Sequence, residues 1–351
     1  MRIGVINGDG IGPEIVPVAL DVAVAAAERV GLTLEPVPLA MGQTAIAEVG
    51  DPLPGATLAA LDDLDCWILG PHDSAGYPPE FRGRLTPGAV IRKRYDLYAN
   101  LRPARAYAGV PATTPDIDVL IVRENSEGLY ADRNMAVGSG EFMPTPDVAL
   151  AVGVITRAAS ERIARVAFER ARRRRKRVTV VHKANVLTMT TGLFRDVCLE
   201  VARDYPEVTV DEQHVDAMAA LLVRRPADFD VLVTENLFGD ILSDLAAELA
   251  GSLGLAASIN ASDTKAMAQA AHGAAPDIAG QDRGNPVALI ESTAMLLDWW
   301  SQRDADERGA EAAVLIRAAV AAALAGGAAT ADLGGTLGTA AFGVAVRQQI
   351  S

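Results

Sequence analysis

The chain has 351 residues, enough for two domains or one large one, and half of them are hydrophobic, so it can bury a sizeable core. Its 32 Lys and Arg residues stand against 45 Asp and Glu residues, and the net charge of −13 argues against nucleic acid and anionic membranes as partners. An anionic substrate would therefore need a local cluster of arginines.

Short apolar runs alternate with amphipathic segments along the chain. The pattern predicts strands, in chain order, at residues 3–6, 66–69, 119–122, 178–181, 208–210 and 231–234. It predicts helices at residues 15–29, 160–175, 195–204, 289–300 and 310–324. Residues 131–147 contain Gly, Ser and Pro without a period, which predicts an arm or a loop. The alternation favours an α/β protein with a largely parallel sheet.

Cysteine usage and the N-terminus indicate the compartment. The two cysteines, Cys66 and Cys198, cannot form a disulfide framework and fit a reducing cytosol. The opening residues MRIGVI contain no basic stretch followed by an apolar run, so no signal peptide is predicted. The Ala-rich stretches carry charges or glycines and do not reach membrane-spanning length. We therefore expect a cytoplasmic protein.

A basic run covers residues 170–177 and is broken only by Ala171. Such a run could form a nucleic-acid patch, but here it lies at the predicted end of a helix, where cations are favourable. We interpret it as a solvated helix end.

Two glycine-rich segments are candidates for nucleotide binding. The first, GDGIGP at residues 8–13, follows a predicted strand, but its spacing is not that of the G-x-G-x-x-G fingerprint. A Rossmann domain is therefore not expected. The second, at residues 272–286, offers small residues for close approach to phosphates, His272 to stack or hydrogen-bond, and Asp277 to hold a ribose diol. It predicts either a cofactor site or only a glycine-rich loop.

Asp240 and Asp244 are four residues apart in LFGDILSD, a spacing that places both carboxylates on one face of a helix. Two like charges in a mostly apolar segment are costly unless a positive group lies between them. Oxygen ligands of this kind favour Mg²⁺ or Mn²⁺. The alternative interpretation is a pair of solvated helix carboxylates.

Seven motifs follow one another across nearly the whole chain: NGDGIGPE, IRKRYDLYANLRP, VRENSEGLY, HKANVL, HVDAMA, NLFGDILSDLA and HGAAPDIAG. In this order they resemble the β-decarboxylating dehydrogenase family, which includes isopropylmalate, homoisocitrate, isocitrate and tartrate dehydrogenases. The resemblance implies the isocitrate/isopropylmalate dehydrogenase-like fold with two α/β domains, in a homodimer or a higher even oligomer. It implies a large cofactor-binding domain at residues 1–99 and 251–351. Residues 100–250 would form a small domain with the dimer interface and the arm, at about residues 131–147.

The resemblance also assigns substrate-binding residues. Arg92, Arg102 and Arg123 match the family's three substrate arginines, and Thr86 lies in the segment before the first of them. Guanidinium groups suit a malate-like acid because they pair bidentately with carboxylates and keep their charge.

The metal and catalytic residues come from the same motifs. Asp240 and Asp244, together with Asp216 from the partner subunit, match the family's metal ligands. Lys183 matches the lysine that enters from the partner subunit beside the substrate hydroxyl, and Tyr130 matches the family's tyrosine acid. Asp216 therefore counts among both the catalytic and the metal-binding candidates.

For the cofactor, the resemblance implies NAD. The family's NAD enzymes carry an Asp where Asp277 stands, whereas NADP-preferring relatives carry Lys and Tyr at positions 277 and 278. Three departures from the family pattern would weaken phosphate binding: Gln269 for Glu, Ala274 for Ser, and QDRGN for KGIAN. The cofactor-binding candidates are His272, Gly273, Ala274, Ala275, Asp277, Ile278 and Asn285.

The substituent at C3 of the substrate is read by the segment before the first arginine, here residues 81–91. Isopropylmalate enzymes carry leucines at the positions of Gly88 and Ala89, and homoisocitrate enzymes carry an Arg at position 89. Neither pattern is kept, although Arg82 or Arg84 could meet an acidic tail. We therefore expect a 3-substituted malate of the isopropylmalate or homoisocitrate type, with tartrate, D-malate or isocitrate as alternatives.

The expected activity is NAD-dependent and divalent-metal-dependent oxidative decarboxylation of this hydroxy acid to a 2-oxo acid. An alternative of another class is a non-catalytic, nucleotide-binding regulatory subunit. Such a subunit would have lost the tyrosine, the lysine or a metal aspartate, and all five of these residues are present here. An enzyme is therefore expected.

Overall fold

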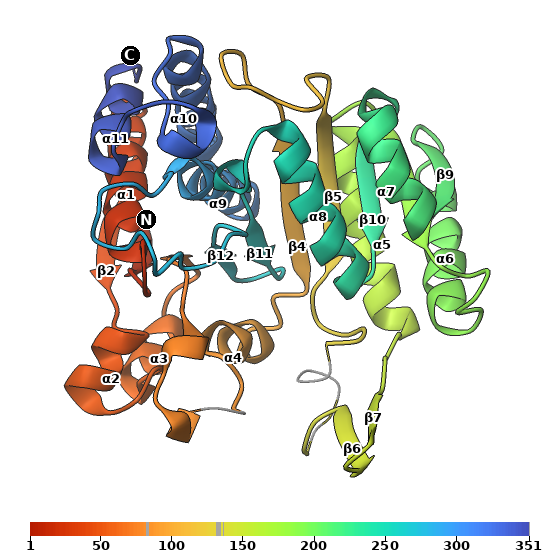
Figure 1. Cartoon of the computed structure of the whole chain (residues 1–351). Coiled ribbons are helices and arrows are strands. Elements are labelled where there is room, and N and C mark those ends of the chain that lie inside the picture. Colours follow the sequence, from red (N-terminus) through yellow and green to blue (C-terminus); the bar gives the residue numbers. More distant parts are fainter. Residues whose placement is uncertain (82–83, 131–134, 136, 351) are drawn as a thin grey trace. The chain divides into compact units, whose positions relative to one another are not determined.

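The computed structural model describes residues 1–81, 84–130, 135 and 137–350, which form two compact units (Figure 1). Unit 1 consists of Met1–Tyr95, Tyr107–Thr113 and Ala250–Ser351, and unit 2 consists of Asp96–Ala106 and Thr114–Leu249. Unit 1 thus contains both ends of the sequence, while most of unit 2 comes from the middle. No helix of the described ranges is both long and apolar enough to cross a membrane.

Unit 1 contains five strands in the order β2-β1-β3-β12-β11. They are β1 (Arg2–Ile6), β2 (Glu35–Pro38), β3 (Cys66–Leu69), β11 (Ile259–Ala261) and β12 (Ala266–Ala268). All neighbouring pairs are parallel except β11 with β12. The central strand β3 is the apolar run CWIL, and all four of its residues are buried, as expected for a parallel strand with neighbours on both sides.

The helices of unit 1 cover its sheet. They are α1 (Gly12–Arg29), α2 (Gln43–Val49), α3 (Gly55–Asp62), α4 (Pro87–Arg94), α9 (Val287–Asp304), α10 (Glu307–Ala325) and α11 (Thr339–Gln348). Helices α1, α9, α10 and α11 pack against one another, and α9 also packs on β3, β11 and β12 (Figure 1). Because α9 lies between sheet and helices, it is buried on almost every side.

Unit 2 contains five neighbouring strands in the order β4-β5-β10-β8-β9. The strands are β4 (Ala99–Arg105), β5 (Asp118–Glu124), β8 (Arg177–His182), β9 (Thr209–His214) and β10 (Val231–Thr234). Only the β4–β5 pair is antiparallel. Four longer helices accompany the sheet: α5 (Arg157–Arg172), α6 (Thr190–Val201), α7 (Val215–Arg224) and α8 (Asn236–Ala250). The predicted α/β class with largely parallel pairing is thus confirmed.

Single turns of 3₁₀-helix complete the described secondary structure. They are η1 (Ser74–Gly76), η2 (Pro79–Phe81), η4 (Ala202–Asp204), η5 (Pro226–Asp228), η6 (Leu253–Leu255) and η7 (Ala331–Leu333). Such short runs are typical connectors because their hydrogen-bond geometry is poorer than that of an α-helix.

Two strands form a small hairpin sheet of their own. Strands β6 (Glu141–Thr145) and β7 (Val148–Ala151) pair antiparallel, and every residue of both strands is exposed (Figure 1). Of the two alternatives predicted for residues 131–147, a loop is wrong for 141–145, which form a strand, and an arm stays a prediction. Residues 131–134 and 136 lie outside the described residues. An isolated hairpin is at best marginally stable in water.

The basic run covers the last turn of α5, the turn that follows it and the first residue of β8, so it ends a helix and precedes a strand as predicted. Helix α5 ends at Arg172, and the positive φ of 58° at Lys176 turns the chain toward β8. The arginines of this run pair with acidic side chains: Arg172 with Glu207, Arg174 with Asp118 and Asp230, Arg175 with Asp118, and Arg177 with Asp211. These ion pairs engage the guanidinium groups within unit 2.

The glycines after β1 serve close packing of loops. A Cβ at Gly10, whose φ is +60°, would meet the carbonyl oxygen of Ala274 at 1.9 Å, and that oxygen accepts a hydrogen bond of 2.9 Å from the amide of Ile11. Only glycine can combine this φ with such an approach at low cost. The first glycine-rich segment therefore supports the segment at 272–286, and the expectation that it is not a Rossmann fingerprint is consistent with this role.

The buried carboxyl group of Glu127 should make the stability of the protein depend on pH. Its Oε1 accepts the Thr156 amide at 2.7 Å and its Oε2 hydrogen-bonds the Thr156 hydroxyl at 2.9 Å, just before α5. Burial raises its pKa from 4.5 to about 7, against the lowering effect of the Thr156 amide. Between these values the folded state keeps a proton that the unfolded state has lost, so the free energy of unfolding should fall as the pH rises. Linkage limits the fall to roughly 3 kcal/mol.

Glu127→Gln should remove this dependence. Urea unfolding at pH 5 and pH 7.5 would measure this dependence. We expect the free energy of unfolding of the variant, relative to that of the unmodified protein, to be higher at pH 7.5 than at pH 5. A difference between the two proteins that stays constant across this range would contradict the assignment.

Candidate active site

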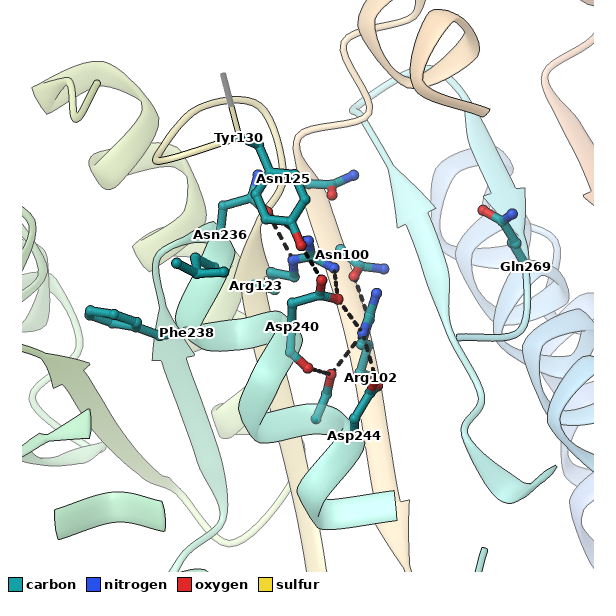
Figure 2. Close-up of polar contacts among 12 residues, drawn as sticks. Asn100, Arg102, Arg123, Asn125, Tyr130, Asn236, Phe238, Asp240, Asp244 and Gln269 are labelled. Carbon is teal, nitrogen blue, oxygen red and sulfur yellow. Dashed lines mark hydrogen bonds and ion pairs between the residues drawn. The ribbon is translucent and has the colours of Figure 1, made fainter. Parts of the chain in front are cut away.

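In unit 2 the two aspartates of α8 share one guanidinium group. Nη1 of Arg102, on β4, lies 3.0 Å from Oδ1 of Asp240 and 3.6 Å from Oδ1 of Asp244 (Figure 2). The same nitrogen donates to the hydroxyl of Ser243 at 2.7 Å, and Nε donates to Asn100 at 2.7 Å. The positive group that the spacing of the aspartates requires is therefore an arginine of the same chain.

A second arginine binds the same carboxylate. Nη1 of Arg123, on β5, donates to Oδ1 of Asp240 at 2.6 Å (Figure 2). Its Nε and Nη2 both donate to Oδ1 of Asn236, at 3.1 and 2.6 Å, and its side chain is only 5% exposed. Gly239 allows this approach, because a Cβ there would meet Cγ of Arg123 at 2.6 Å. The glycine of LFGDILSD thus brings α8 close to β5.

Tyr130 completes the cluster around Asp240. Its hydroxyl donates a short hydrogen bond to Oδ2 of Asp240, and the guanidinium carbon of Arg123 lies 5.3 Å from the centre of its ring (Figure 2). Each carboxylate oxygen of Asp240 is therefore engaged, one by arginines and the other by a phenol.

The charges of this cluster shift the pKa values of its members. Burial acts to raise the pKa of Asp240, but Arg123 and Arg102 outweigh it, so the pKa is lowered. Burial raises the pKa of Asp244 despite Arg102, and the charge of Asp240 adds to the rise. Burial, with the charge of Arg123, lowers the pKa of Arg102 to about 10. A further cation would stabilise both carboxylates in their ionised forms.

Hard oxygen donors of this kind fit Mg²⁺ or Mn²⁺. The two carboxylates of α8 are the only such donors gathered here, since no group of three or more His, Cys, Asp or Glu side chains that could hold a metal occurs within the described ranges. The donor set fits a divalent ion that takes further ligands from water, substrate or another subunit.

Lys183 and Asp216 form a separate pair in unit 2. The lysine follows β8, the aspartate lies in the first turn of α7, and its carboxylate accepts a short hydrogen bond from Nζ. This hydrogen bond lowers the pKa of Asp216, which is mostly exposed. The backbone carbonyl of Lys183 accepts the amide of Val186 at 3.0 Å, and two apolar side chains of this segment are exposed: Val186 is 67% and Met189 is 86% exposed.

Unit 1 holds the remaining substrate-binding candidates. Arg92 lies on α4, and its Nη1 donates to Oε1 of Gln269, just after β12, at 3.3 Å. Thr86 is the N-cap of α4, and its hydroxyl accepts from the Ala89 amide at 3.3 Å. Arg84 is exposed with its guanidinium carbon 5.5 Å from the centre of the Phe81 ring, whereas Arg82 lies outside the described residues.

The cofactor-binding candidates lie on one loop of unit 1, between β12 and α9. Asn285 is buried, with its amide nitrogen 2.9 Å from Asp332 and its oxygen accepting the Val287 amide at 3.0 Å. Gly273 and Asp277 are exposed, Ala275 and Ile278 are half-buried, and Ala275 has a positive φ of 42°. Nδ1 of His272 is 3.0 Å from the carbonyl oxygen of Gly273.

The structure thus brings Arg102, Arg123, Tyr130, Asp240 and Asp244 into one cluster, with Lys183 and Asp216 as a pair elsewhere in unit 2. The roles assigned to all these residues stay predictions. Sequence reasoning missed the polar side chains that hold the arginines, and no spacing rule points to them: Asn100, Asn236 and Ser243. The sequence indicates Gln269 only as a departure from the family pattern that would weaken phosphate binding. In the structure its side chain contacts Arg92.

Comparison with known proteins decides the family. The sequence model described as isocitrate/isopropylmalate dehydrogenase matches residues 2–346. The chain belongs to the isocitrate/isopropylmalate dehydrogenase family. The resemblance drawn from the seven motifs is thereby confirmed. Members of this family are dehydrogenases that act on hydroxy acids.

Alignments with individual members of this family extend over most of this chain and most of the relative. The chain is 42% identical over 320 residues to a 3-isopropylmalate dehydrogenase of Sulfurisphaera tokodaii, covering 91% of this chain and 89% of the relative. It is 44% identical over 317 residues to an isocitrate/homoisocitrate dehydrogenase of Thermus thermophilus, covering 90% of each. The crystal structure of isocitrate dehydrogenase from Methylococcus capsulatus matches with a TM-score of 0.86 at 39% identity, and the match covers 99% of each chain. The predicted isocitrate/isopropylmalate dehydrogenase-like fold is confirmed.

Proposed function

We propose that the chain catalyses NAD-dependent and divalent-metal-dependent oxidative decarboxylation of a 3-substituted malate to a 2-oxo acid. The observation that carries the proposal is the cluster on α8, in which two arginines and a tyrosine converge on Asp240 beside Asp244. Guanidinium groups provide carboxylate binding, the aspartates provide metal ligands, and the phenol provides a proton donor. Tartrate, D-malate and isocitrate remain alternative substrates of the same chemistry.

The chain's residues have distinct tasks in this reaction. When bound, a divalent ion at Asp240 and Asp244 supplies Lewis acidity to the C2 oxygen, and NAD supplies the acceptor for the C2 hydride. Arg92, Arg102 and Arg123 bind and orient the substrate carboxylates. Nζ of Lys183, once it has lost its own proton, accepts the hydroxyl proton, and after carbon dioxide leaves, the hydroxyl of Tyr130 donates a proton to C3. Thr86 would contribute its hydroxyl beside the substrate.

A homodimer belongs to the proposal, with residues 100–250 as its interface domain and residues 1–99 and 251–351 as the cofactor domain. The support is exposed apolar surface: Val186 and Met189 after β8, and Phe142, Met143 and Leu150 of the β6–β7 hairpin, are all at least 46% exposed. Apolar surface of this kind marks protein interfaces. Lys183 precedes Val186 by three residues and pairs with Asp216, and we assign both to the partner's active site, with Asp216 as its third metal aspartate.

The proposed cofactor is NAD, bound by His272, Gly273, Ala274, Ala275, Asp277, Ile278 and Asn285. The exposed Asp277 carboxylate would accept both adenosine ribose hydroxyls and repel a 2′-phosphate. Like-charge contact costs several kcal/mol, so we expect a preference for NAD over NADP of roughly a hundredfold or more.

Replacing Asp277 with Lys and Ile278 with Tyr should lower kcat/KM for NAD and raise it for NADP, because the diol acceptor is lost and a phosphate partner is gained. Initial rates with both cofactors would measure the change. Glu311→Lys, an exposed position on α10, is the matched control for added positive charge and should change neither. Equal use of both cofactors by the unmodified protein would show that this loop is not the selector.

The function itself is tested with the purified chain, Mn²⁺ and a panel of malate, tartrate, isocitrate, homoisocitrate and 3-isopropylmalate. We expect NADH and carbon dioxide to form with at least one acid and to stop in excess chelator. If there is neither NAD reduction nor thermal stabilisation by any acid, the regulatory-subunit interpretation would be favoured. We also place the protein in the cytoplasm, in line with its two free and buried cysteines.

A further inference from the structure

His72 lies beside Arg92 in unit 1, against a glycine that leaves room for it. A Cβ built at Gly88 would lie 2.7 Å from Cε1 and 3.4 Å from Nε2 of His72, and 3.3 Å from Nη1 of Arg92. The imidazole therefore occupies the space into which any side chain at position 88 would extend. Gly88 is the second residue of α4, and Arg92 lies one turn further along the same helix.

The backbone on both sides of His72 is held by one buried residue, Asp9. The amide of Asp9 donates to the carbonyl oxygen of Pro71 at 2.7 Å, and Oδ2 of Asp9 accepts the amide of Asp73 at 2.9 Å. The hydroxyl of Tyr77 donates to the same Oδ2 at 2.7 Å. The residues before and after His72 are thus anchored, which positions the imidazole.

The imidazole is neutral, and among the described residues its Nδ1 has no hydrogen-bond partner. Burial, followed by the charge of Arg92, lowers the pKa of His72 to about 4, although Asp9 and Asp73 act in the opposite direction. Its Nδ1 is buried and accepts or donates no hydrogen bond within the described residues. A neutral imidazole has one donor and one acceptor nitrogen, and a buried polar atom left without a partner destabilises the free protein. A ligand group that hydrogen-bonds this ring would remove the cost.

We propose that His72 is a specificity-determining residue, which hydrogen-bonds a polar substituent at C3 of the acid bound at Arg92, either a hydroxyl or a side chain that ends in a carboxylate. The inference rests on the proposed function and adds to it the class of substituent. An alkyl substituent would leave the imidazole unsatisfied, whereas a polar one would pair with it beside a fixed positive charge. Gly88 serves the same end, since its missing side chain makes room for the ring.

The test compares His72→Leu, which keeps the side-chain size, with the unmodified protein. The probes are malate, which has no C3 substituent, 3-isopropylmalate, which has an alkyl one, and tartrate and isocitrate, which have polar ones. Both kcat/KM and the dissociation constant from titration calorimetry are measured. We expect kcat/KM and affinity for tartrate or isocitrate to fall by a factor of roughly ten to a hundred, as for the loss of a buried hydrogen bond to a polar or charged group. The values for malate should change little.

Two further variants guard against a purely structural effect. His72→Gln keeps a hydrogen-bonding side chain and should recover part of the preference for the polar acids. Gly88→Ala introduces the Cβ that meets the imidazole. It should weaken binding of the same acids, although His72 itself is not substituted. Melting temperatures of all variants show whether each is folded.

The outcomes separate the inference from the proposed function. An equal loss for malate and the polar acids, or tighter binding of 3-isopropylmalate by the unmodified protein, would overturn the role of His72 and leave the oxidative decarboxylation intact. Polar acids that bind in a His72-dependent way but are never oxidised would overturn the proposed reaction and support the role of His72. If none of the acids binds or reacts, both fail.

Discussion

Asp240→Asn is expected to lower kcat/KM by roughly a thousandfold or more at any practical Mg²⁺ or Mn²⁺ concentration, because the variant loses the ionised ligand of a Lewis-acid ion. The same carboxylate accepts hydrogen bonds from Arg102, Arg123 and Tyr130. The substitution therefore also leaves two guanidinium groups without their shared negative partner. Steady-state kinetics and calorimetric titration with Mn²⁺ would show both losses.

Two controls isolate the effect on the metal. Glu311→Gln removes one exposed negative charge on α10 and should keep both activity and Mn²⁺ affinity. Asp244→Asn should weaken Mn²⁺ binding with a smaller loss of stability, since Asp244 is half exposed and its Oδ1 lies 3.6 Å from Nη1 of Arg102. Full activity of Asp240→Asn, or of the unmodified protein in excess chelator, would contradict the assignment.

Lys183→Ala and Tyr130→Phe should each be nearly inactive, yet regain activity when the two variants are unfolded and refolded together. If Lys183 serves the partner's active site, a mixed dimer contains one site in which both residues are intact. Random pairing of equal amounts would then restore up to about a quarter of the unmodified activity in a twofold-symmetric dimer. Differently tagged variants allow the heterodimer to be isolated and assayed.

Each variant refolded alone is the control, and its activity should stay low. An isolated heterodimer without activity would show that Lys183 and Tyr130 of one site come from the same chain. Lys183 forms an ion pair with Asp216 of its own chain, so both residues should serve the partner's active site. Asp216→Asn should therefore complement Tyr130→Phe in the same way.

The fold was predictable where burial follows a simple period. Strands β3 and β10 begin and end at the predicted residues because all their side chains are buried and all but Thr234 are apolar. Helix α4 (PGAVIRKR) and strand β4 were missed, since neither has the apolar spacing of its class. The hairpin β6–β7 escaped prediction because it is exposed on both faces and contains Pro144. The predicted end of α5 was too late, because a left-handed residue cannot be read from RRRRK.

The site was predictable to the extent that charge demands compensation. The spacing of Asp240 and Asp244 required a positive group, and the structure provides Arg102, but spacing alone could not distinguish an arginine from a metal ion. The polar contacts of Asn236 and Ser243 depend on which strand lies beside α8. His72 gave no signal of its own, and only the missing side chain at Gly88 could have drawn attention to its surroundings.

Arg102 has two competing demands on its single charge. In the structure it neutralises the repulsion between Asp240 and Asp244, and in the proposed reaction it binds a substrate carboxylate. A substrate that draws the guanidinium away exposes the two aspartates to each other and so raises their affinity for a divalent ion. A bound ion, in turn, releases the guanidinium for the substrate. The coupling free energy is the same in both directions, so acid and metal ion should each tighten the binding of the other by one common factor.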